Sequence, residues 1–376
     1  MSAHPDGAPN AEAAAAIEPH KTFDTILVLD FGSQYSHLIT RRLRELHIYS
    51  EMLPCDYDLS TLSWKPKGII LSGGPYSVYE EGAPHASEKI YDMGIPILGI
   101  CYGLQEMAWH FGKNVLAGEK REFGQANLKV EAHDGNVSAL FSGVPSDGMT
   151  VWMSHGDKLS HLPDDFQTIA STPNAPFAGI AHKSKPFYGI QFHPEVTHTP
   201  QGTVLLGNFA ATICGAQQNW TMAKFVDQEI ARIRALVGDK GQVIGAVSGG
   251  VDSTVTAKLM DRAIGSRFHA VFINGGILRE NEAAEVETTL KAGLEINLHV
   301  VDKTDAFLSA LKGVTDGEQK RKIIGAQFIS AFKEKSQAIV EEAKNTPNAG
   351  SIDFLAQGTL YPDVIESLSF KGPSGK

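Results

Sequence analysis

The chain has 376 residues, which at roughly 100–200 residues per domain predicts two or three domains. A hydrophobic fraction of 42% and a charged fraction of 20% are typical of a folded globular protein and exclude a disordered or collagen-like chain. The net charge of −10 excludes the broad positive surface with which proteins bind nucleic acid, so nucleic acid is not an expected partner.

The cysteine content indicates the compartment. Cys55, Cys101 and Cys214 form no C-x-x-C pair, which argues against a disulfide framework and against a cysteine zinc site. A reducing compartment fits best, so we expect a cytoplasmic, cytosolic protein. No apolar run approaches the roughly 18 residues that span a membrane, and no membrane association is predicted.

The first residues differ in composition from the rest. Residues 1–22 are rich in alanine and lack the basic segment that begins a secretory signal, so we interpret them as a disordered leader. An organelle-targeting sequence is the alternative, which the acidic residues Asp6 and Glu12 disfavour.

Apolar runs alternate with helical patterns from residue 25 onward, which predicts βα units around a largely parallel sheet. The clearest buried strands are Ile26–Asp30, Gly68–Ser72 and Ile95–Ile100. A glycine-containing turn and a helical stretch follow each of them, so functional groups are expected at the carboxyl ends of the strands. Between residues 128 and 192 the strand signals become shorter and closer together, which predicts an antiparallel elaboration. A closing helix is expected over Gly202–Ile213.

A second alternating series begins after the polar stretch Cys214–Asn219, which suits a domain junction and places the predicted boundary after residue 214. The predicted elements are helix Phe225–Val237, strand Gln242–Val247, a helix ending at Ile264, strand Phe268–Ile273, helix Asn281–Ala292, strand Glu295–Val301 and an amphipathic helix Lys320–Lys335. The predicted fold class is therefore α/β, with two doubly wound open-sheet domains over residues 23–214 and 215–376, the first with an antiparallel elaboration.

Cys101 follows strand Ile95–Ile100 and precedes a helical stretch. Small residues on both sides of a nucleophile, here Gly99 and Gly103, permit the sharp strand-to-helix turn that presents its side chain. The amino end of a helix also favours the thiolate, which is the nucleophilic form of cysteine. Downstream, His193 could take the thiol proton while Glu195, two residues later, orients the imidazole.

Each of these residues alone has a simpler interpretation. A single cysteine after an apolar strand is most often a buried small residue, and an isolated His-x-Glu carries little information. The combination with flanking glycines favours the functional interpretation for Cys101, whereas Cys55 and Cys214 lack such surroundings and are interpreted as structural.

Three segments of the chain resemble the class I glutamine amidotransferases. They are Ser72-Gly73-Gly74-Pro75, Leu98–Gln105 and Gln191–Glu195. The resemblance implies that Cys101 attacks the side-chain amide of glutamine, forms a glutamyl thioester and releases ammonia. It also implies that His193 is the general acid and base and that Glu195 orients it.

The same resemblance implies where the substrate binds. Backbone amides at Gly73, Gly74 and Tyr102 would stabilise the developing oxyanion. Gln105, Ser154 and His155 match positions that line the glutamine pocket. For His155, a structural role is an equal alternative.

A second motif lies between strand Gln242–Val247 and the next helix. The backbone amides of its glycines, its hydroxyl groups and the dipole of the helix would favour the binding of an anion there. The alternative is a plain loop, which is the more common role of a serine–glycine turn. It is not a Walker A loop, because no Gly-Lys-Ser/Thr follows. The motif is Ser248-Gly249-Gly250-Val251-Asp252-Ser253-Thr254.

This motif resembles the PP-loop of the N-type ATP pyrophosphatases, which implies that its seven residues bind the pyrophosphate of ATP. Asp252 would be a candidate ligand of the Mg²⁺ that accompanies ATP, and a helix cap is its alternative role. Mg²⁺ is the expected cofactor, and no organic prosthetic group is expected.

Both modules in this order resemble the glutamine-hydrolysing GMP synthases, from about residue 23 to the end of the chain. The resemblance implies that glutamine, ATP and xanthosine monophosphate are the substrates. AMP would be transferred to xanthosine monophosphate, and ammonia would displace it to give GMP, with release of AMP and pyrophosphate.

The chain departs from that family at several places, two of which bear on the synthase reaction. Asn274 stands where the family usually has aspartate, near the adenine side of the ATP site. The family also continues beyond Tyr361-Pro362-Asp363 into a C-terminal domain that mediates dimerisation. We therefore expect residues 215–376 to be an incomplete ATP pyrophosphatase domain, the dimerisation domain to be missing and the synthase reaction to be impaired.

Two alternatives remain open. The chain could be a non-catalytic, nucleotide-sensing or partner-binding relative of the synthases. It could also be a PP-loop amidotransferase with another acceptor, against which the missing C-x-x-C pair and the long match over 356–367 both argue.

Overall fold

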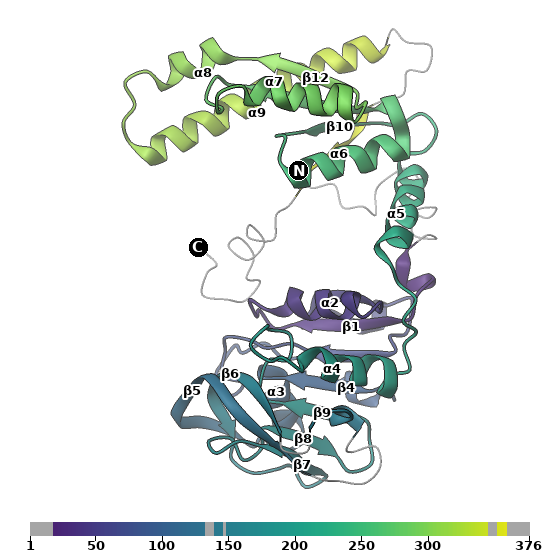
Figure 1. Ribbon diagram of the computed structural model, residues 1–376, viewed down its shortest axis with the longest axis vertical. Coiled ribbons are helices and arrows are strands. Elements are labelled where there is room, and N and C mark those ends of the chain that lie inside the picture. The colour runs from purple at the N-terminus through teal and green to yellow at the C-terminus, as the bar shows by residue number, and fades with distance from the viewer. Residues whose placement is uncertain (1–17, 132–138, 146–147, 345–351, 359–376) are drawn as a thin grey trace. The chain divides into compact units, whose positions relative to one another are not determined.

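The computed structural model of the chain describes residues 18–131, 139–145, 148–344 and 352–358 (Figure 1). These residues divide into two compact units, one over Pro19–Met222 and one from Ala223 onward. Each unit has its own β-sheet with helices packed against it, which confirms the predicted α/β class. Among the described residues, no helix is both long and apolar enough to cross a membrane.

The sheet of the first unit has the strand order β2-β1-β3-β4-β9-β8-β7-β5-β6. The first five of these run parallel to one another, and the other four are added antiparallel. The antiparallel elaboration was predicted, but it begins at β5, before residue 128. The strands are β1 (Thr25–Asp30), β2 (Tyr49–Pro54), β3 (Gly68–Leu71), β4 (Ile97–Ile100), β5 (Val115–Val130), β6 (Met149–Leu159), β7 (Phe166–Ser171), β8 (Gly179–His182) and β9 (Phe187–Ile190).

Side chains of the parallel strands alternate between two hydrophobic cores. In β1, Ile26 and Val28 belong to one core and Leu27 and Leu29 to the other, as expected for a strand that is buried on both faces. Residues of α2 and α4 pack in the first core and residues of α3 in the second. These helices are α2 (Ser36–Glu45), α3 (Tyr102–Gly112) and α4 (Gly202–Gly207), which the π-helical turn η6 (Asn208–Ile213) continues.

Residues Pro19–Thr22 of the predicted leader belong to the first unit. Residues Pro19–Lys21 form the 3-10 helix η2. The ring of His20 stacks on that of Trp64 with centroids 4.8 Å apart, and its Nδ1 lies 3.0 Å from Oε1 of Glu51. These contacts tie the segment to the fold through side chains far away in the sequence, which composition alone could not reveal. Residues 1–17 lie outside the described residues.

The boundary between the units also lies later than predicted, after Met222 rather than after residue 214. The polar stretch in between folds back on the first unit. The N–H of Trp220 donates to the carbonyl of His47 at 2.9 Å, and the side-chain amide of Gln218 donates to the carbonyl of Leu46 at 3.0 Å. The polar composition suggested a junction, but these hydrogen bonds attach the stretch to the end of α2 in the first unit.

The second unit has a parallel four-stranded sheet in the order β12-β11-β10-β13. Residues of α5, α6 and α7 pack in one core of this sheet and residues of α8 and α9 in another, which makes the unit doubly wound. Its elements are α5 (Met222–Val237), β10 (Gln242–Ala246), α6 (Val251–Ile264), β11 (Phe268–Asn274), α7 (Glu282–Glu287) with its π-helical extension η8 (Thr288–Gly293), β12 (Leu298–Asp302), α8 (Thr304–Leu311), α9 (Gly317–Lys344) and β13 (Ile352–Ala356).

The predicted amphipathic helix Lys320–Lys335 is the middle of α9, which is longer at both ends. Ile324, Phe328 and Phe332 pack against the second core of this unit, as their spacing predicted. The extra residues are mostly good helix formers such as alanine, glutamate and lysine, and one of them, Ile339, is buried in the same core.

Candidate active site

Cys101 lies between β4 and α3 in a strained backbone conformation. Its φ of 53° and ψ of −101° lie in a region that costs a non-glycine residue on the order of 1–3 kcal/mol. A Cβ atom on Gly99 would collide with the carbonyl oxygen of Gly103, and one on Gly103 with that of Leu71. The two glycines thus allow α3 to begin directly against the sheet, which gives the sharp turn that the sequence predicted.

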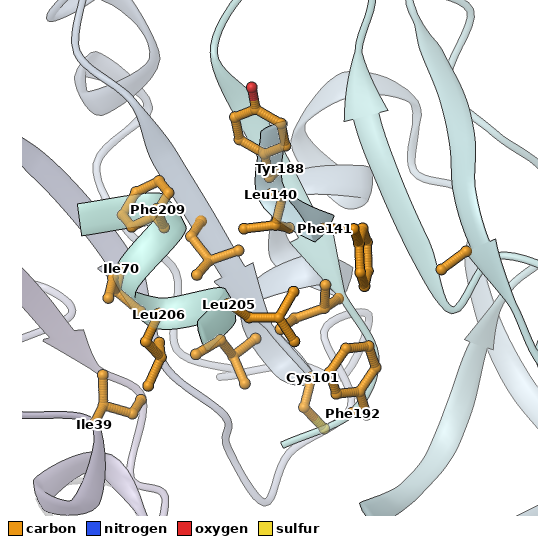
Figure 2. Packing of buried hydrophobic residues seen from close by; sticks show 14 of the residues in the cluster. Ile39, Ile70, Cys101, Leu140, Phe141, Tyr188, Phe192, Leu205, Leu206 and Phe209 are labelled. Atoms are coloured by element: carbon orange, nitrogen blue, oxygen red, sulfur yellow. The ribbon is translucent and has the colours of Figure 1, made fainter. Parts of the chain in front are cut away.

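The thiol lies at a border between apolar and polar surroundings. Cys101 is 5% exposed and belongs to the first core, at whose edge Figure 2 shows it near Phe192. Its Sγ atom is 3.6 Å from the carbonyl oxygen of Ser154 and 3.7 Å from Nε2 of Gln191. The sulfur therefore has polar neighbours even though the residue packs in an apolar cluster.

A buried imidazole–carboxylate pair follows β9. Nδ1 of His193 lies 2.7 Å from Oε1 of Glu195, and neither residue is more than 4% exposed. Burial alone would lower the pKa of His193, but the negative charges of Glu195 and Cys101 and the hydrogen bonds with both hold it well above its usual value. The structure thus brings together the three residues of the predicted triad, in an arrangement that can pass a proton between sulfur and imidazole.

The glycine turn after β3 lies against the imidazole. A Cβ atom on Gly73 would lie 3.2 Å from Cε1 of His193, and one on Gly74 would lie 2.9 Å from the carbonyl oxygen of Phe31. Tyr102 is the first residue of α3, where backbone N–H groups have no partner within the helix. Gly73 and Tyr102 therefore border the imidazole and the thiol, where their amides could meet a developing negative charge.

The predicted glutamine-pocket residues come from α3 and β6. The side-chain amide of Gln105 donates to the carbonyl oxygen of Asp157 at 3.2 Å. His155 lies with Nδ1 2.9 Å from that same carbonyl oxygen and with Nε2 3.2 Å from Oε2 of Glu122. Both ring nitrogens of His155 therefore engage protein acceptors, which favours its structural role, whereas the carbonyl group of Ser154 faces the thiol.

The second predicted motif forms an exposed turn between β10 and α6. The hydroxyl of Ser253 accepts a hydrogen bond from the N–H of Ser248 at 3.2 Å and donates to the carbonyl of Gly250 at 3.0 Å. The N–H of Thr254 donates to the same carbonyl at 3.0 Å. Two hydroxyls, one of Ser248 and one of Ser253, thus lie 3.1 Å apart at the start of a helix, which is a favourable place for an anion.

The structure contradicts one interpretation of this motif. The N-cap of α6 is Gly250, and no side chain caps the helix, so Asp252 is not the cap. Its carboxylate is exposed in the first turn, and Val251, the first residue of α6, is 79% exposed. Asp252 is consequently available to a ligand of the loop.

Comparisons with known proteins agree with both motifs. The family model described as glutamine amidotransferase class-I matches residues 27–213, and the one described as NAD synthase matches residues 221–331. A curated protein from Phaeosphaeria nodorum, named glutamine-hydrolyzing GMP synthase, is 69% identical over 361 residues, covering 95% of this chain and 66% of that protein. One of the same name from Candida albicans is 61% identical over 375 residues, covering 100% of this chain and 67% of that protein.

The chain belongs to the family of glutamine-hydrolysing GMP synthases. It spans 66% of the length of the relative from Phaeosphaeria nodorum. A solved structure, described as that of a putative GMP synthase component from Thermoplasma acidophilum, is 40% identical, with a TM-score of 0.46 over 51% of this chain and 94% of its own.

Asn274, where the GMP synthase family resemblance predicts aspartate, is the last residue of β11. Its side-chain amide donates to Oδ2 of Asp302 at 3.4 Å, and its Oδ1 accepts from the N–H of Gly276 at 3.0 Å. Asp302 ends the neighbouring strand β12. A carboxylate is therefore present at this edge of the sheet, on the strand next to the one on which the resemblance predicts it.

Sequence reasoning missed several residues around the triad. The ring of Tyr35 meets that of His193 edge-on with centroids 5.6 Å apart, and Thr199 and Trp152 hydrogen-bond to the backbone of His193. Tyr35 follows β1, so the rule that functional groups gather at the carboxyl ends of strands could have found it. Thr199 carries no such signal, because the local sequence does not show that the turn after His193 folds back toward β6.

Gly249→Ala is expected to destabilise the second unit by about 1–3 kcal/mol. Gly249 has a φ of 78°, and a Cβ atom there would collide with Cγ2 of Val286 on α7. Gly250→Ala is the matched control, because its φ is −68° and the nearest atom to its Cβ would be Oγ of Ser248 at 3.4 Å. Urea unfolding followed by circular dichroism measures both, and equal losses would contradict the steric explanation.

Proposed function

We propose that the first unit is a glutaminase, which supplies ammonia to a synthase reaction in the second unit. The observation that carries this proposal is the strained turn at Cys101 beside the buried pair of His193 and Glu195, with 2.7 Å between Nδ1 and Oε1. Membership of the GMP synthase family supports it, since the relatives are named glutamine-hydrolyzing.

The proposed first reaction proceeds through a thioester. The Cys101 sulfur attacks the side-chain amide carbon of glutamine, while amides at Gly73 and Tyr102 stabilise the oxyanion. His193 takes the proton of the thiol and donates it to the amide nitrogen. The carbon–nitrogen bond then breaks, and ammonia leaves. Water, deprotonated by His193, then cleaves the thioester, which releases glutamate and restores the thiol.

The proposed second reaction uses ATP at the loop Ser248–Thr254. Backbone amides and the hydroxyls of Ser248 and Ser253 would hold the pyrophosphate portion of ATP. The α-phosphoryl group, as AMP, would pass to the 2-oxygen of xanthosine monophosphate, and pyrophosphate would leave. Ammonia would then attack the carbon that bears this oxygen, displace AMP and give GMP.

Asp252 is the proposed protein ligand of Mg²⁺. No group of three or more His, Cys, Asp and Glu side chains that could hold a metal occurs in the described ranges. Mg²⁺ in ATP-dependent enzymes usually takes only one or two carboxylates and completes its shell with phosphates and water. An exposed carboxylate in the first turn of α6 fits that requirement. With Mg²⁺ bound there, negative charge on the departing pyrophosphate would be offset.

Product assays on the 376-residue chain test both reactions. With glutamine alone or with ATP and xanthosine monophosphate added, we expect glutamate and ammonia to form, and their absence in both mixtures would overturn the glutaminase proposal. We expect pyrophosphate only when ATP and xanthosine monophosphate are both present. ATP that raises the melting temperature but yields no pyrophosphate in any mixture would favour a nucleotide-sensing role instead.

A further inference from the structure

The buried hydroxyl of Thr199, in the turn that follows the triad histidine, hydrogen-bonds to the backbone of that histidine. Thr199 is 3% exposed, and its N–H donates to the carbonyl of Val196 at 3.1 Å, which closes the turn. Its Oγ1 donates to the carbonyl oxygen of His193 at 2.7 Å and accepts from the N–H of Trp152 at 3.0 Å. One hydroxyl thus satisfies two backbone groups that would otherwise be costly to bury.

Trp152 also holds His193 directly. The N–H of His193 donates to the carbonyl oxygen of Trp152 at 3.0 Å. Together with the two bonds of the Thr199 hydroxyl, this contact closes a ring of three hydrogen bonds between the backbone of His193 and β6. His193 lies beyond the last residue of β9, Ile190, so this ring fixes its backbone where the strand itself no longer does.

The position of that backbone determines where the imidazole lies. The ring orientation is restrained by Glu195 at 2.7 Å and by the edge-on contact with Tyr35. A shift of the backbone would still carry the ring away from Cys101. Displacements of about 1 Å in an active site can cost about 100-fold in rate.

We propose that Thr199 is a positioning residue for the Cys101–His193 pair. Its hydroxyl fixes the backbone of His193 to β6 and so keeps the imidazole within reach of the thiol. Thr199 acts through His193 and not on the reacting atoms. This inference rests on the proposed glutaminase function and adds to it a residue outside the triad.

Thr199→Val tests the proposal, because valine keeps the shape of the side chain and removes only the hydroxyl. We expect kcat for glutamine hydrolysis to fall about tenfold or more, while KM stays within about twofold because the glutamine pocket is unchanged. Thr199→Ser retains the hydroxyl and should keep kcat within about threefold of the parent chain. Assays are run at a temperature at which circular dichroism shows all three proteins folded.

Alkylation of Cys101 by iodoacetamide gives a readout that does not need glutamine turnover. A protonated imidazole near the sulfur favours the reactive thiolate. In Thr199→Val, Cys101 should therefore be alkylated more slowly at neutral pH, and the pH at which alkylation becomes fast should be higher. In Thr199→Ser, Cys101 should react as in the parent chain.

The outcomes separate this inference from the proposed function. A parent chain that hydrolyses no glutamine would refute the proposed function, and the alkylation profiles would still decide the role of Thr199. The inference is overturned if Thr199→Val matches the parent in kcat and alkylation, or if Thr199→Ser is as impaired as Thr199→Val.

Discussion

Cys101→Ala is expected to lower the rate of glutamine hydrolysis by about 10⁴-fold or more. The sulfur atom forms the bond to the amide carbon, and no neighbouring group in the described site can replace it, because His193 and Glu195 act on the proton. Binding of glutamine and the oxyanion amides would remain, which leaves only a small residual rate. Glutamate release, measured as kcat and KM on the full chain, checks this expectation.

Cys214→Ala is the matched control. Burial raises the pKa of the Cys214 thiol well above its usual value, so this thiol stays protonated and unreactive. Its sulfur lies near Gly68 at the beginning of β3, whereas Cys101 follows the end of β4. We expect Cys214→Ala to hydrolyse glutamine within about twofold of the parent rate. Persistent activity in Cys101→Ala, or equal loss in both variants, would contradict the assignment of the nucleophile.

The elements nearest to Cys101 could be predicted because local rules determine them. A short run of apolar residues, buried on both faces, indicates a parallel strand, and Gly99 and Gly103 mark a turn in which no side chain fits. The loop at Gly249 follows the same logic, since its φ of 78° and the nearby Val286 require glycine. Where a sequence signal reports a steric requirement of the backbone, it identifies the site directly.

The remaining features depend on contacts between distant segments, which the local sequence does not encode. The sequence leaves the role of His155 open between binding substrate and holding the fold, because its partner Glu122 comes from the long strand β5. Thr199 reaches His193 only because a turn folds back toward β6. The interaction of Trp220 with His47 likewise displaced the unit boundary from the position that composition indicated.

These contacts have a common consequence for the triad. Trp152 and Thr199 hold the histidine through its backbone, Tyr35 restrains its ring, and Glu195 binds its Nδ1. Motif matching finds only the last of these, because the other contacts join segments that have no fixed spacing in the sequence. The geometry of the triad therefore depends on more of the first unit than its three motif residues suggest.

Glu195→Gln is expected to lower kcat for glutamine hydrolysis by about 10²–10⁴-fold. Burial opposes a positive charge on His193, and the charges of Glu195 and Cys101 overcome it to hold the pKa of His193 well above its usual value. Glutamine at position 195 keeps the shape but removes one of these charges, so the pKa of His193 falls. The protonated imidazole is then lost at lower pH, and the high-pH limb of the kcat profile should move to lower pH.

The same change has a signed effect on stability. A pKa that is raised in the folded state stabilises the fold below the unfolded value, about 6.5 for histidine, and this stabilisation is lost as the pH rises through the folded-state value. Glu195→Gln should therefore lower the free energy of unfolding most at mildly acidic pH and less at alkaline pH. Urea unfolding across this range measures it.

Glu51→Gln is the control for both measurements, because Glu51 also contacts a histidine, with 3.0 Å between its Oε1 and Nδ1 of His20. This pair lies at β2, away from Cys101. Its kcat should stay within about twofold of the parent, with an unchanged pH profile. If Glu195→Gln retained the parent pH profile while losing rate, the carboxylate would act only by orienting the imidazole. If neither rate nor profile changed, Glu195 would have no part in the reaction, and the buried pair would be structural.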